Sequence, residues 1–250
     1  SSFNASSSTT YTATFTPSGD GAKTLDVAGG VFTDSAGNNN SAASQFNWTY
    51  DTAVPTMAIT SSTVSDGATS SDSTIAMIFT SSEATSNFVI RDMIVSSGAL
   101  SSLSASATTY TATFTPSAQG ATTIDIAGGG FTDSSGNTNS VATQFNWTFD
   151  TVVPSMAITS STVSDGATSN NSTLAMIFTS NEATTNFVIG DISVSGGALS
   201  SFTASSSTVY TATFTPSGDG AKTIDVAGGV FTDSAGNNNS AASQFNWTYD

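Results

Sequence analysis

Carboxylate and amide side chains at three places in the chain are the residues best suited to chemistry. Asp51 lies in the segment Asp-Thr-Ala-Val-Pro, Glu83 lies in Ser-Glu-Ala, and Asp133 begins Asp-Ser-Ser-Gly-Asn, which ends at Asn137. The pattern recurs further along the chain as Asp150, Glu182, Asp233 and Asn237. Calcium takes about six to eight oxygen ligands in proteins, from carboxylates, amides, main-chain carbonyls and water. These residues are therefore the candidate metal ligands.

The rest of the composition argues against catalysis. The chain has no His and no Cys, so it lacks the commonest general base, the usual zinc ligands and any disulfide. The sequence also contains no nucleophile motif and no carboxylate cluster in an expected cleft. We therefore expect that the protein is not an enzyme.

The charge of the chain limits its partners. Lys and Arg total 3 against 18 Asp and Glu, which gives a formal net charge of -15. Such a surface repels nucleic acid phosphates and anionic lipid, and it attracts cations. No apolar run approaches the roughly 20 residues of a membrane span. We expect no nucleic acid partner and no membrane span in this segment, which we expect to belong to a longer protein.

An internal repeat supplies the elements that must position the candidate ligands. Gln-Phe-Asn-Trp-Thr begins at positions 45, 144 and 244, and Tyr-Thr-Ala-Thr-Phe begins at positions 11, 110 and 210. The period of about 100 residues is the size of one immunoglobulin-like sandwich. The linker motif Asp-Thr-x-x-Pro at positions 51 and 150 sets the register. It predicts complete domains at 52–150 and 151–250, and it leaves 1–51 as the C-terminal half of a domain, with strands D to G.

The half domain is nearly a copy of the end of the chain. Residues 1–51 differ from residues 200–250 at Asn4/Thr203, Thr10/Val209 and Leu25/Ile224. A half sandwich exposes its inner face and its sheet edges, so it should not be stable alone. Either its first strands have been lost, or another chain supplies them.

Alternating apolar and polar residues predict an all-β fold. Helix-forming Leu, Glu, Lys and Arg are scarce, whereas Thr suits strands and Gly, Asn and Ser suit turns. In domain 52–150 we expect strands A to G near 56–60, 74–80, 87–91, 93–104, 110–115, 122–127 and 144–149. Seven such strands fit a two-sheet Greek-key sandwich.

The strand order brings the candidate ligands together. Because strands alternate in direction, the B–C, D–E and F–G loops lie at the N-terminal end of each domain, beside the incoming linker. Asp51, Glu83 and Asp133 with Asn137 should meet there, and the later set should meet at the next junction. Asp-x-x-Gly-Asn is also a good turn by itself, and Glu83 could be a solvated loop charge. The sequence leaves a calcium site and a plain turn as alternatives.

The ordered motifs resemble those of bacterial Ig-like repeats of large exported adhesins and biofilm-associated surface proteins. The resemblance is carried by Ser-Glu-Ala, Phe-Val-Ile-x-Asp, Tyr-Thr-Ala-Thr-Phe-Thr-Pro, Phe-Thr-Asp-Ser-x-Gly-Asn and Asp-Thr-x-x-Pro, and it covers the whole chain. It implies a sandwich fold, secretion, a stalk-like role and calcium between domains, without catalysis. The expected partners are neighbouring repeats and other cells or surfaces.

Two functions follow as expectations. The first is a structural segment of an extracellular adhesin or surface stalk, stiffened by calcium at the domain junctions. The second is a subunit of a self-assembling extracellular filament, in which strands from a neighbouring chain complete the half domain. The partner of Phe15, Phe46 and Trp48 separates the two hypotheses.

Overall fold

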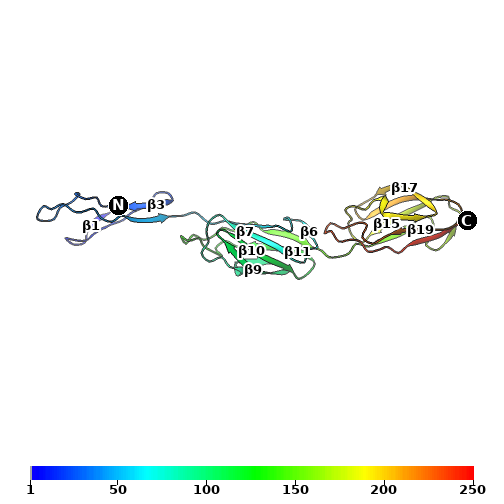
Figure 1. Ribbon diagram of the computed structural model, residues 1–250, viewed down its shortest axis with the longest axis horizontal. Helices are drawn as coiled ribbons and strands as arrows, with labels where there is room; N and C mark the ends of the chain where they lie inside the picture. The colour runs from blue at the N-terminus through cyan, green and yellow to red at the C-terminus, as the bar shows by residue number, and fades with distance from the viewer. Residues whose placement is uncertain (1) are drawn as a thin grey trace.

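Three bodies follow one another along the long axis of the protein. The computed structural model describes residues 2–250, and Figure 1 shows the N-terminal segment at one end and the C-terminus at the other. Apart from two 3-10 turns, the named elements are β-strands. No helix among these residues is long and apolar enough to span a bilayer.

The middle body is a sandwich of two four-stranded sheets. Their strand orders are β5-β7-β10-β9 and β6-β12-β11-β8. The strands are Met57–Ser61 (β5), Thr69–Ser70 (β6), Ile75–Ser81 (β7), Met93–Val95 (β8), Gly98–Ser106 (β9), Thr109–Pro116 (β10), Gly120–Ile126 (β11) and Phe145–Phe149 (β12). Their pairs are antiparallel, except that β6 runs parallel to β12. This arrangement confirms the expected immunoglobulin-like fold.

The C-terminal body repeats the same plan. Its sheets have the orders β13-β15-β18-β17 and β14-β20-β19-β16. The strands are Met156–Ser160 (β13), Thr168–Ser169 (β14), Leu174–Ser180 (β15), Ile192–Ser195 (β16), Gly197–Ala204 (β17), Val209–Pro216 (β18), Gly220–Val226 (β19) and Phe245–Tyr249 (β20).

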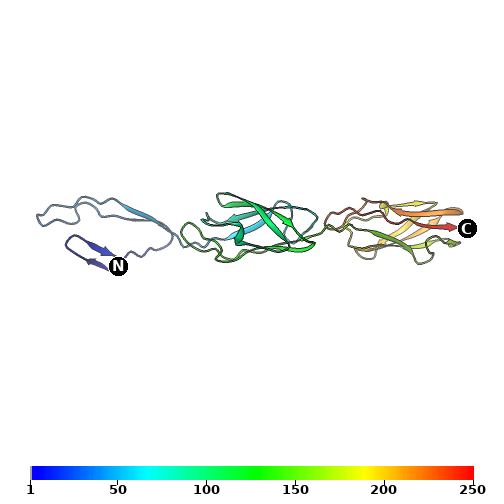
Figure 2. The ribbon, with the colours of Figure 1, turned by 90° about the horizontal axis from the view of Figure 1, so that it is seen from below.

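The N-terminal segment contains two hairpins without a shared sheet. The strands are Phe3–Ala5 (β1), Tyr11–Ala13 (β2), Gly21–Leu25 (β3) and Phe46–Tyr50 (β4). β1 pairs with β2, and β3 pairs with β4. Figure 2 shows the two hairpins as separate ribbons at one end of the molecule. By sequence they correspond to β17–β18 and β19–β20 of the C-terminal body.

Alternation along the strands builds the core of each sandwich. In β7, Ile75, Met77 and Phe79 are all 0% exposed, while Ala76 between them faces solvent. From the opposite sheet, Trp147 packs edge-on against Phe114 with ring centroids 4.8 Å apart. Each large side chain buried in this way contributes about 1.5–3 kcal/mol. The aromatic side chains of the last strand, Phe145 and Trp147, belong to this core, as Phe245 and Trp247 do in the C-terminal body.

The expectation for strands C and D is wrong in its boundaries. Residues 87–91 lead into a 3-10 turn, η1 (Ile90–Asp92), and the third strand is instead β8. The Asp92 carboxylate accepts a hydrogen bond from the Val89 amide at 2.8 Å, which closes this turn. The segment expected as strand D is therefore divided between β8 in one sheet and β9 in the other. The turn η2 (Ile189–Asp191) repeats the arrangement.

Candidate metal centre

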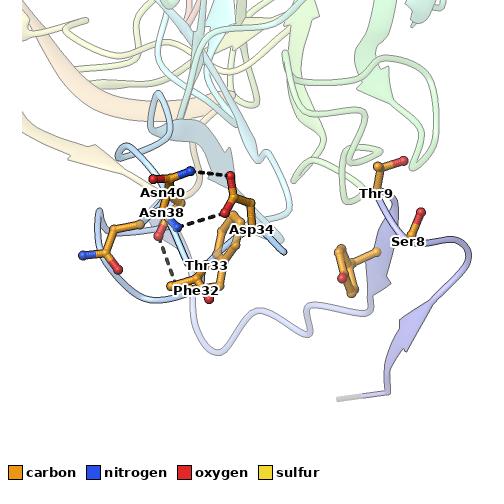
Figure 3. A pocket seen from close by; sticks show the side chains of 9 residues that line it. Ser8, Thr9, Phe32, Thr33, Asp34, Asn38 and Asn40 are labelled. Carbon is orange, nitrogen blue, oxygen red and sulfur yellow. Dashed lines mark hydrogen bonds between the residues drawn. The ribbon is translucent and has the colours of Figure 1, made fainter. Parts of the chain in front are cut away.

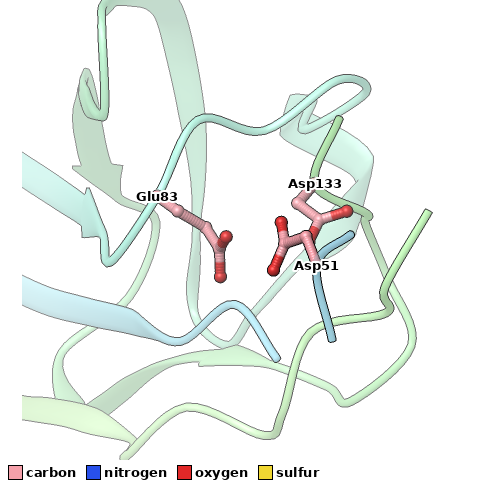
Figure 4. A group of neighbouring side chains, drawn as sticks. All are labelled: Asp51, Glu83 and Asp133. Carbon is pink, nitrogen blue, oxygen red and sulfur yellow. The ribbon is translucent and has the colours of Figure 1, made fainter. Parts of the chain in front are cut away.

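The first acidic group lies where the linker enters the middle body. Asp51 precedes β5, Glu83 follows β7, and Asp133 lies in the loop between β11 and β12. Each residue offers a carboxylate oxygen, and these oxygens all lie within 4.8 Å of one another. Figure 4 shows the three side chains converging from three separate segments. The predicted meeting of the linker with the B–C and F–G loops is thus observed.

The loop 133–137 is folded around the carboxylate of Asp133, which is 2% exposed. Its Oδ1 accepts hydrogen bonds from the amides of Ser135 at 2.8 Å and Asn137 at 2.9 Å. Its Oδ2 accepts one from Asn137 Nδ2 at 2.8 Å. Burial opposes the charged form, but the hydrogen bonds outweigh it and lower the pKa of Asp133. A fixed negative charge therefore lies at the base of the group.

The linker residue Asp51 is held against this loop. Asn137 Nδ2 donates to the main-chain oxygen of Asp51 at 3.1 Å, and Ser135 Oγ donates to Asp51 Oδ2 at 3.0 Å. Asp51 Oδ1 accepts a bond from the Ala53 amide at 3.0 Å. These bonds hold the Asp51 carboxylate beside Asp133, where a single cation could contact both.

Glu83 completes the group, and its surroundings disfavour its charged form. Burial raises the pKa of Glu83, and the charges of Asp51 and Asp133 raise it further. Like charges this close disfavour ionisation of one member. A cation bound between the three carboxylates would remove this repulsion, so the donor set fits a hard oxygen-binding ion. Calcium suits it better than magnesium, which demands tighter octahedral geometry.

The second acidic group repeats the first at the next junction. The carboxylate oxygens of Asp150, Glu182 and Asp233 also lie within 4.8 Å of one another. Asn237 Nδ2 donates to Asp150 O at 3.0 Å and to Asp233 Oδ2 at 2.8 Å. Burial, followed by the charges of Asp150 and Asp233, raises the pKa of Glu182.

The two groups differ at two neighbouring positions. Ala235 occupies the position of Ser135 in the first group. The second group therefore lacks the hydroxyl that donates a hydrogen bond to the linker aspartate Asp51 in the first group. Asn181 stands where the first group has Ser82, and its Nδ2 donates to Glu182 Oε1 at 3.3 Å. The second group therefore keeps a freer Asp150 carboxylate and a better-supported Glu182.

Each linker is also bonded to the body before it. Thr52 donates from its amide and from Oγ1 to Asp20 Oδ1, at 3.1 Å and 2.9 Å. At the next junction the Thr151 amide donates to Gln119 Oε1 at 2.9 Å, and Gln119 Nε2 donates to Thr151 Oγ1 at 2.8 Å. Each linker therefore has polar contacts with both neighbours.

The second junction has one further contact between bodies. Ser71, which follows β6 in the middle body, donates from Oγ to the main-chain oxygen of Ala235 at 3.1 Å. Ala235 belongs to the same loop as Asp233, so the acidic group lies directly beside the preceding body.

The N-terminal segment contains one of the three carboxylates of an acidic group. Asp34 makes the same turn as Asp133, because Asn38 donates to it from its side chain and its amide, and these bonds lower the pKa of Asp34. The positions equivalent to Asp51 and Glu83 fall outside the half repeat. Asp34 instead borders an open hollow of about 530 Å³, lined also by Tyr11 and Phe32, and Figure 3 shows the side chains of Asp34 and Phe32 at this hollow.

The structure thus brings together the six carboxylates that the sequence singled out, as two groups of three. Asn137 and Asn237 lie in contact with these groups through Nδ2 rather than through oxygen, and a metal-binding role for all eight residues stays a prediction. The sequence did not single out Ser135 or the residues that bond to the linker threonines, Asp20 and Gln119. Their positions in equivalent turns of successive repeats could have identified the latter pair.

Comparison with protein families decides what kind of repeat this is. The model of the bacterial Ig-like domain matches residues 51–149 and 150–249. The chain belongs to the bacterial Ig-like domain family. The two matches follow each other directly, and each contains one of the two sandwiches. The resemblance of the motifs to bacterial Ig-like repeats is therefore confirmed.

Two bacterial proteins are among the similar solved structures. InvD of Yersinia pseudotuberculosis is 16% identical, with 80% of this chain and 58% of that chain covered and a TM-score of 0.38. Invasin, described as a bacterial integrin-binding protein, is 12% identical, with 96% and 55% covered and a TM-score of 0.45. This chain thus spans little more than half the length of either. At such identities the likeness concerns the fold alone. No curated protein matched the chain.

Proposed function

We propose that the chain is a structural segment of an extracellular bacterial adhesin or surface stalk, stiffened by calcium at its domain junctions. The observation that carries this proposal is the group of three carboxylates at each junction, one from the linker and two from the following domain. Its domains are a C-terminal half domain at 1–51, of which Ser1 lies outside the described residues, and complete domains at 52–150 and 151–250. The role is non-enzymatic.

Family membership and the order of the bodies support a spacer role. Ig-like units joined end to end extend over a long distance. Their short linkers, which form hydrogen bonds with the body before and the body after, favour a stiff rod. A surface with a net charge of -15 stays soluble and resists collapse by self-repulsion. These features suit a stalk that holds an adhesive module, or another surface contact, away from the cell.

Calcium would act on the linker as well as on the loops. An ion between Asp51, Glu83 and Asp133 links the linker to two loops of the following domain at once. Extracellular calcium modules bind with dissociation constants of about 10⁻⁴–10⁻³ M. At 10 mM calcium this gives about 1.4–2.7 kcal/mol per site by mass action. The junction would therefore stiffen outside the cell and loosen where calcium is scarce.

Thermal unfolding of the full chain in 10 mM calcium and in chelator tests the metal sites. We expect calcium to raise the midpoint by several degrees, because it binds only the folded junction. In a chain with Asp51→Asn, Glu83→Gln, Asp150→Asn and Glu182→Gln the increase should disappear. Asp219→Asn, which changes an exposed carboxylate away from both groups, is the matched control and should retain it. An unchanged midpoint in the unmodified chain would refute calcium binding.

The second candidate function is a subunit of an extracellular filament, in which strands from a neighbouring chain complete the half domain 1–51 and cover its exposed apolar side chains. Phe15 is 48% exposed and Phe46 is 63% exposed. A neighbouring chain that covered them would link molecules end to end. Sedimentation at rising protein concentration tests this: a filament subunit forms oligomers that Phe15→Asp abolishes, whereas a stalk segment remains a monomer.

A further inference from the structure

The longest strands at the sheet edges are β9 and its counterpart β17. β9 has 9 residues and β17 has 8, and each lies at one end of the strand order of its sheet. The other edge strands of the two sandwiches run from 2 residues, in β6 and β14, to 5, in β5 and β13. An edge strand carries unpaired N–H and C=O groups, to which another chain can add a strand. The long edges of β9 and β17 are therefore the places where such pairing is easiest.

The outer side of β9 has unpaired backbone groups. In an antiparallel pair, hydrogen-bonded residues alternate with residues whose backbone groups point away from the partner. The Ser117 amide donates to Ser97 O at 2.9 Å, so residues 99 and 101, which lie opposite 115 and 113, bond to β10. The N–H and C=O of Leu100 then point away from β10 and, by the register of the two strands, so do those of Ala105. Among residues 2–250 no further strand pairs with this side.

The residue types of the two strands lack the usual protection of an edge. Proteins blunt edge strands with charged side chains, with Pro, with short length or with a β-bulge. Gly98–Ser106 and Gly197–Ala204 contain no charged residue and no Pro, although the chain has a net charge of -15. Since the two strands are also long, a bulge is the remaining means of protection.

Both strands carry a β-bulge at the same place. The register of β9 on β10 shifts so that Ser102 and Leu103 lie opposite the single residue Ala112. The register of β17 on β18 shifts in the same way at Ser201. The φ angles of Ser102 and Ser201 are 59° and 54°, in the left-handed region, which is costly for residues other than Gly. Each sandwich therefore keeps a strained serine in its longest edge strand.

The core does not need the extra residue. Leu100 and Leu103 both pack against the core of the middle body. Side chains two apart in a regular strand share a face, so removal of Ser102 would leave Leu103 two places after Leu100 and on the same face. Leu199 and Phe202 have the same relation in the C-terminal body. The effect of the bulge therefore falls on the outer edge, where an extra residue bends and twists the strand.

We propose that the bulges at Ser102 and Ser201 block edge-to-edge pairing of β9 and β17 with a second copy of the chain. Both strands begin with Gly-Ala-Leu-Ser-Ser, so copies that lay side by side would bring matching edges together. The bend at each bulge breaks the regular spacing of the outward N–H and C=O groups that a shared ladder requires. The strained serines thus keep neighbouring copies separate, and this effect needs no calcium.

Deletion of Ser102 and Ser201 from the full 250-residue chain removes both bulges and keeps the side chains that face the core. Amide hydrogen exchange, read by mass spectrometry, compares this chain with the unmodified one at rising protein concentration, in chelator and 1 M NaCl. At this salt concentration the Debye length is about 3 Å, so repulsion between the acidic surfaces is screened. In the deletion chain we expect exchange in β9 and β17 to slow at least about tenfold with concentration, and sedimentation to show dimers or larger species. The same strands of the unmodified chain should show no such slowing.

Two matched chains test whether the edge itself is responsible. In the deletion chain, Ala105→Pro with Ala204→Pro removes one outward N–H from each edge and no bond to β10 or β18, so it should abolish the slowing. Ser102→Gly with Ser201→Gly keeps the bulges, since Gly adopts a positive φ readily, and this chain should behave as the unmodified one.

Several results would overturn the role of the bulges. One is a deletion chain in which β9 and β17 exchange at the same rate at every concentration, even if it associates through other residues. Others are slowing that the two prolines leave intact, and equal slowing in the unmodified chain or in the chain with the two glycines. Loss of protection in β7 and β10 of the deletion chain would overturn it as well, because the fold itself would then require the bulge.

Discussion

Within the first junction the glutamate and the loop aspartate carry opposite electrostatic roles. Hydrogen bonds from the loop lower the pKa of Asp133, whereas burial and two neighbouring charges raise the pKa of Glu83. The group therefore has one carboxylate that the fold stabilises as an anion and one that the fold strains. A cation bound there would relieve the strained member most, so metal binding would be coupled to proton release.

The pH dependence of stability in chelator should reveal the strained glutamates. A carboxyl group whose pKa is higher in the folded state destabilises the fold at pH values above that pKa, and the penalty is relieved as pH falls towards the unfolded value. Glu83→Gln with Glu182→Gln should therefore be more stable than the unmodified chain at pH 7. The difference should shrink on acidification and vanish below about pH 4.5. Urea unfolding across this range measures it, and a pH-independent difference would contradict the strain.

Buried Asn139 is a second residue whose role depends on its surroundings. Its side chain accepts a bond from the Phe131 amide at 2.9 Å and donates to Ala127 O and Ser140 O at 2.8 Å and 2.7 Å. Asn139→Ala leaves three main-chain groups unpaired in the fold. Each costs about 1–3 kcal/mol, so we expect a loss of at least about 3 kcal/mol in urea unfolding.

Asn40 provides the matched control for this loss. It makes the equivalent bonds in the N-terminal segment, where its surroundings are open to water. Asn40→Ala should therefore change stability by less than about 1 kcal/mol, because water replaces the lost partners. Equal losses for the two variants would show that burial does not set the cost.

At the scale of the elements, one turn residue and one strand residue that lie close together both differ between the two sandwiches. Gly196, before β17, has a φ of 72° and lies so close to Lys222 of β19 that a Cβ at 196 would be 2.6 Å from Lys222 Cδ. Lys222 is 3% exposed, and its Nζ donates to Ser217 O at 3.2 Å. The middle body has Ser97 and Thr122 at these positions. The shorter threonine leaves room for the serine.

A double-mutant cycle tests this coupling. Gly196→Ser should destabilise the chain by about 1–3 kcal/mol, because the new side chain displaces the buried lysine stem. In Lys222→Thr the same glycine substitution should cost less, with an interaction energy of at least about 1 kcal/mol. Urea unfolding of the four chains measures it, and additive changes would exclude the steric link.

The elements also show where sequence reasoning succeeds. Alternation identified β7, β10, β11 and β12, because burial of every second side chain produces an alternating sequence pattern. It misplaced strand C, because the turn Ile90–Asp92 depends on a bond from the Val89 amide to Asp92 that periodicity does not report. It also missed β6, whose two residues are too short to show a period. Strand direction was enough to predict that Asp51, Glu83 and Asp133 would meet.

On the scale of the whole molecule, the linkers decide whether the chain behaves as a rod. Polar contacts join each linker to both neighbours, but such exposed bonds contribute little against solvent competition. We expect the acidic groups to make the difference, since an ion bound there links the linker to two loops of the next domain. Reach, the property that a stalk needs, would then depend on calcium concentration.

The most direct test is a distance measurement across the second junction with and without calcium. The chain has no Cys, so Ala99→Cys and Ala198→Cys place two spin labels at exposed, equivalent positions of the two sandwiches. Pulsed electron spin resonance should give a narrow distance distribution in calcium and a broader one in chelator. Asp150→Asn with Glu182→Gln should keep the broad distribution in both conditions, whereas Asp51→Asn with Glu83→Gln, at the other junction, should respond normally. Distributions of equal width with and without calcium would contradict the account.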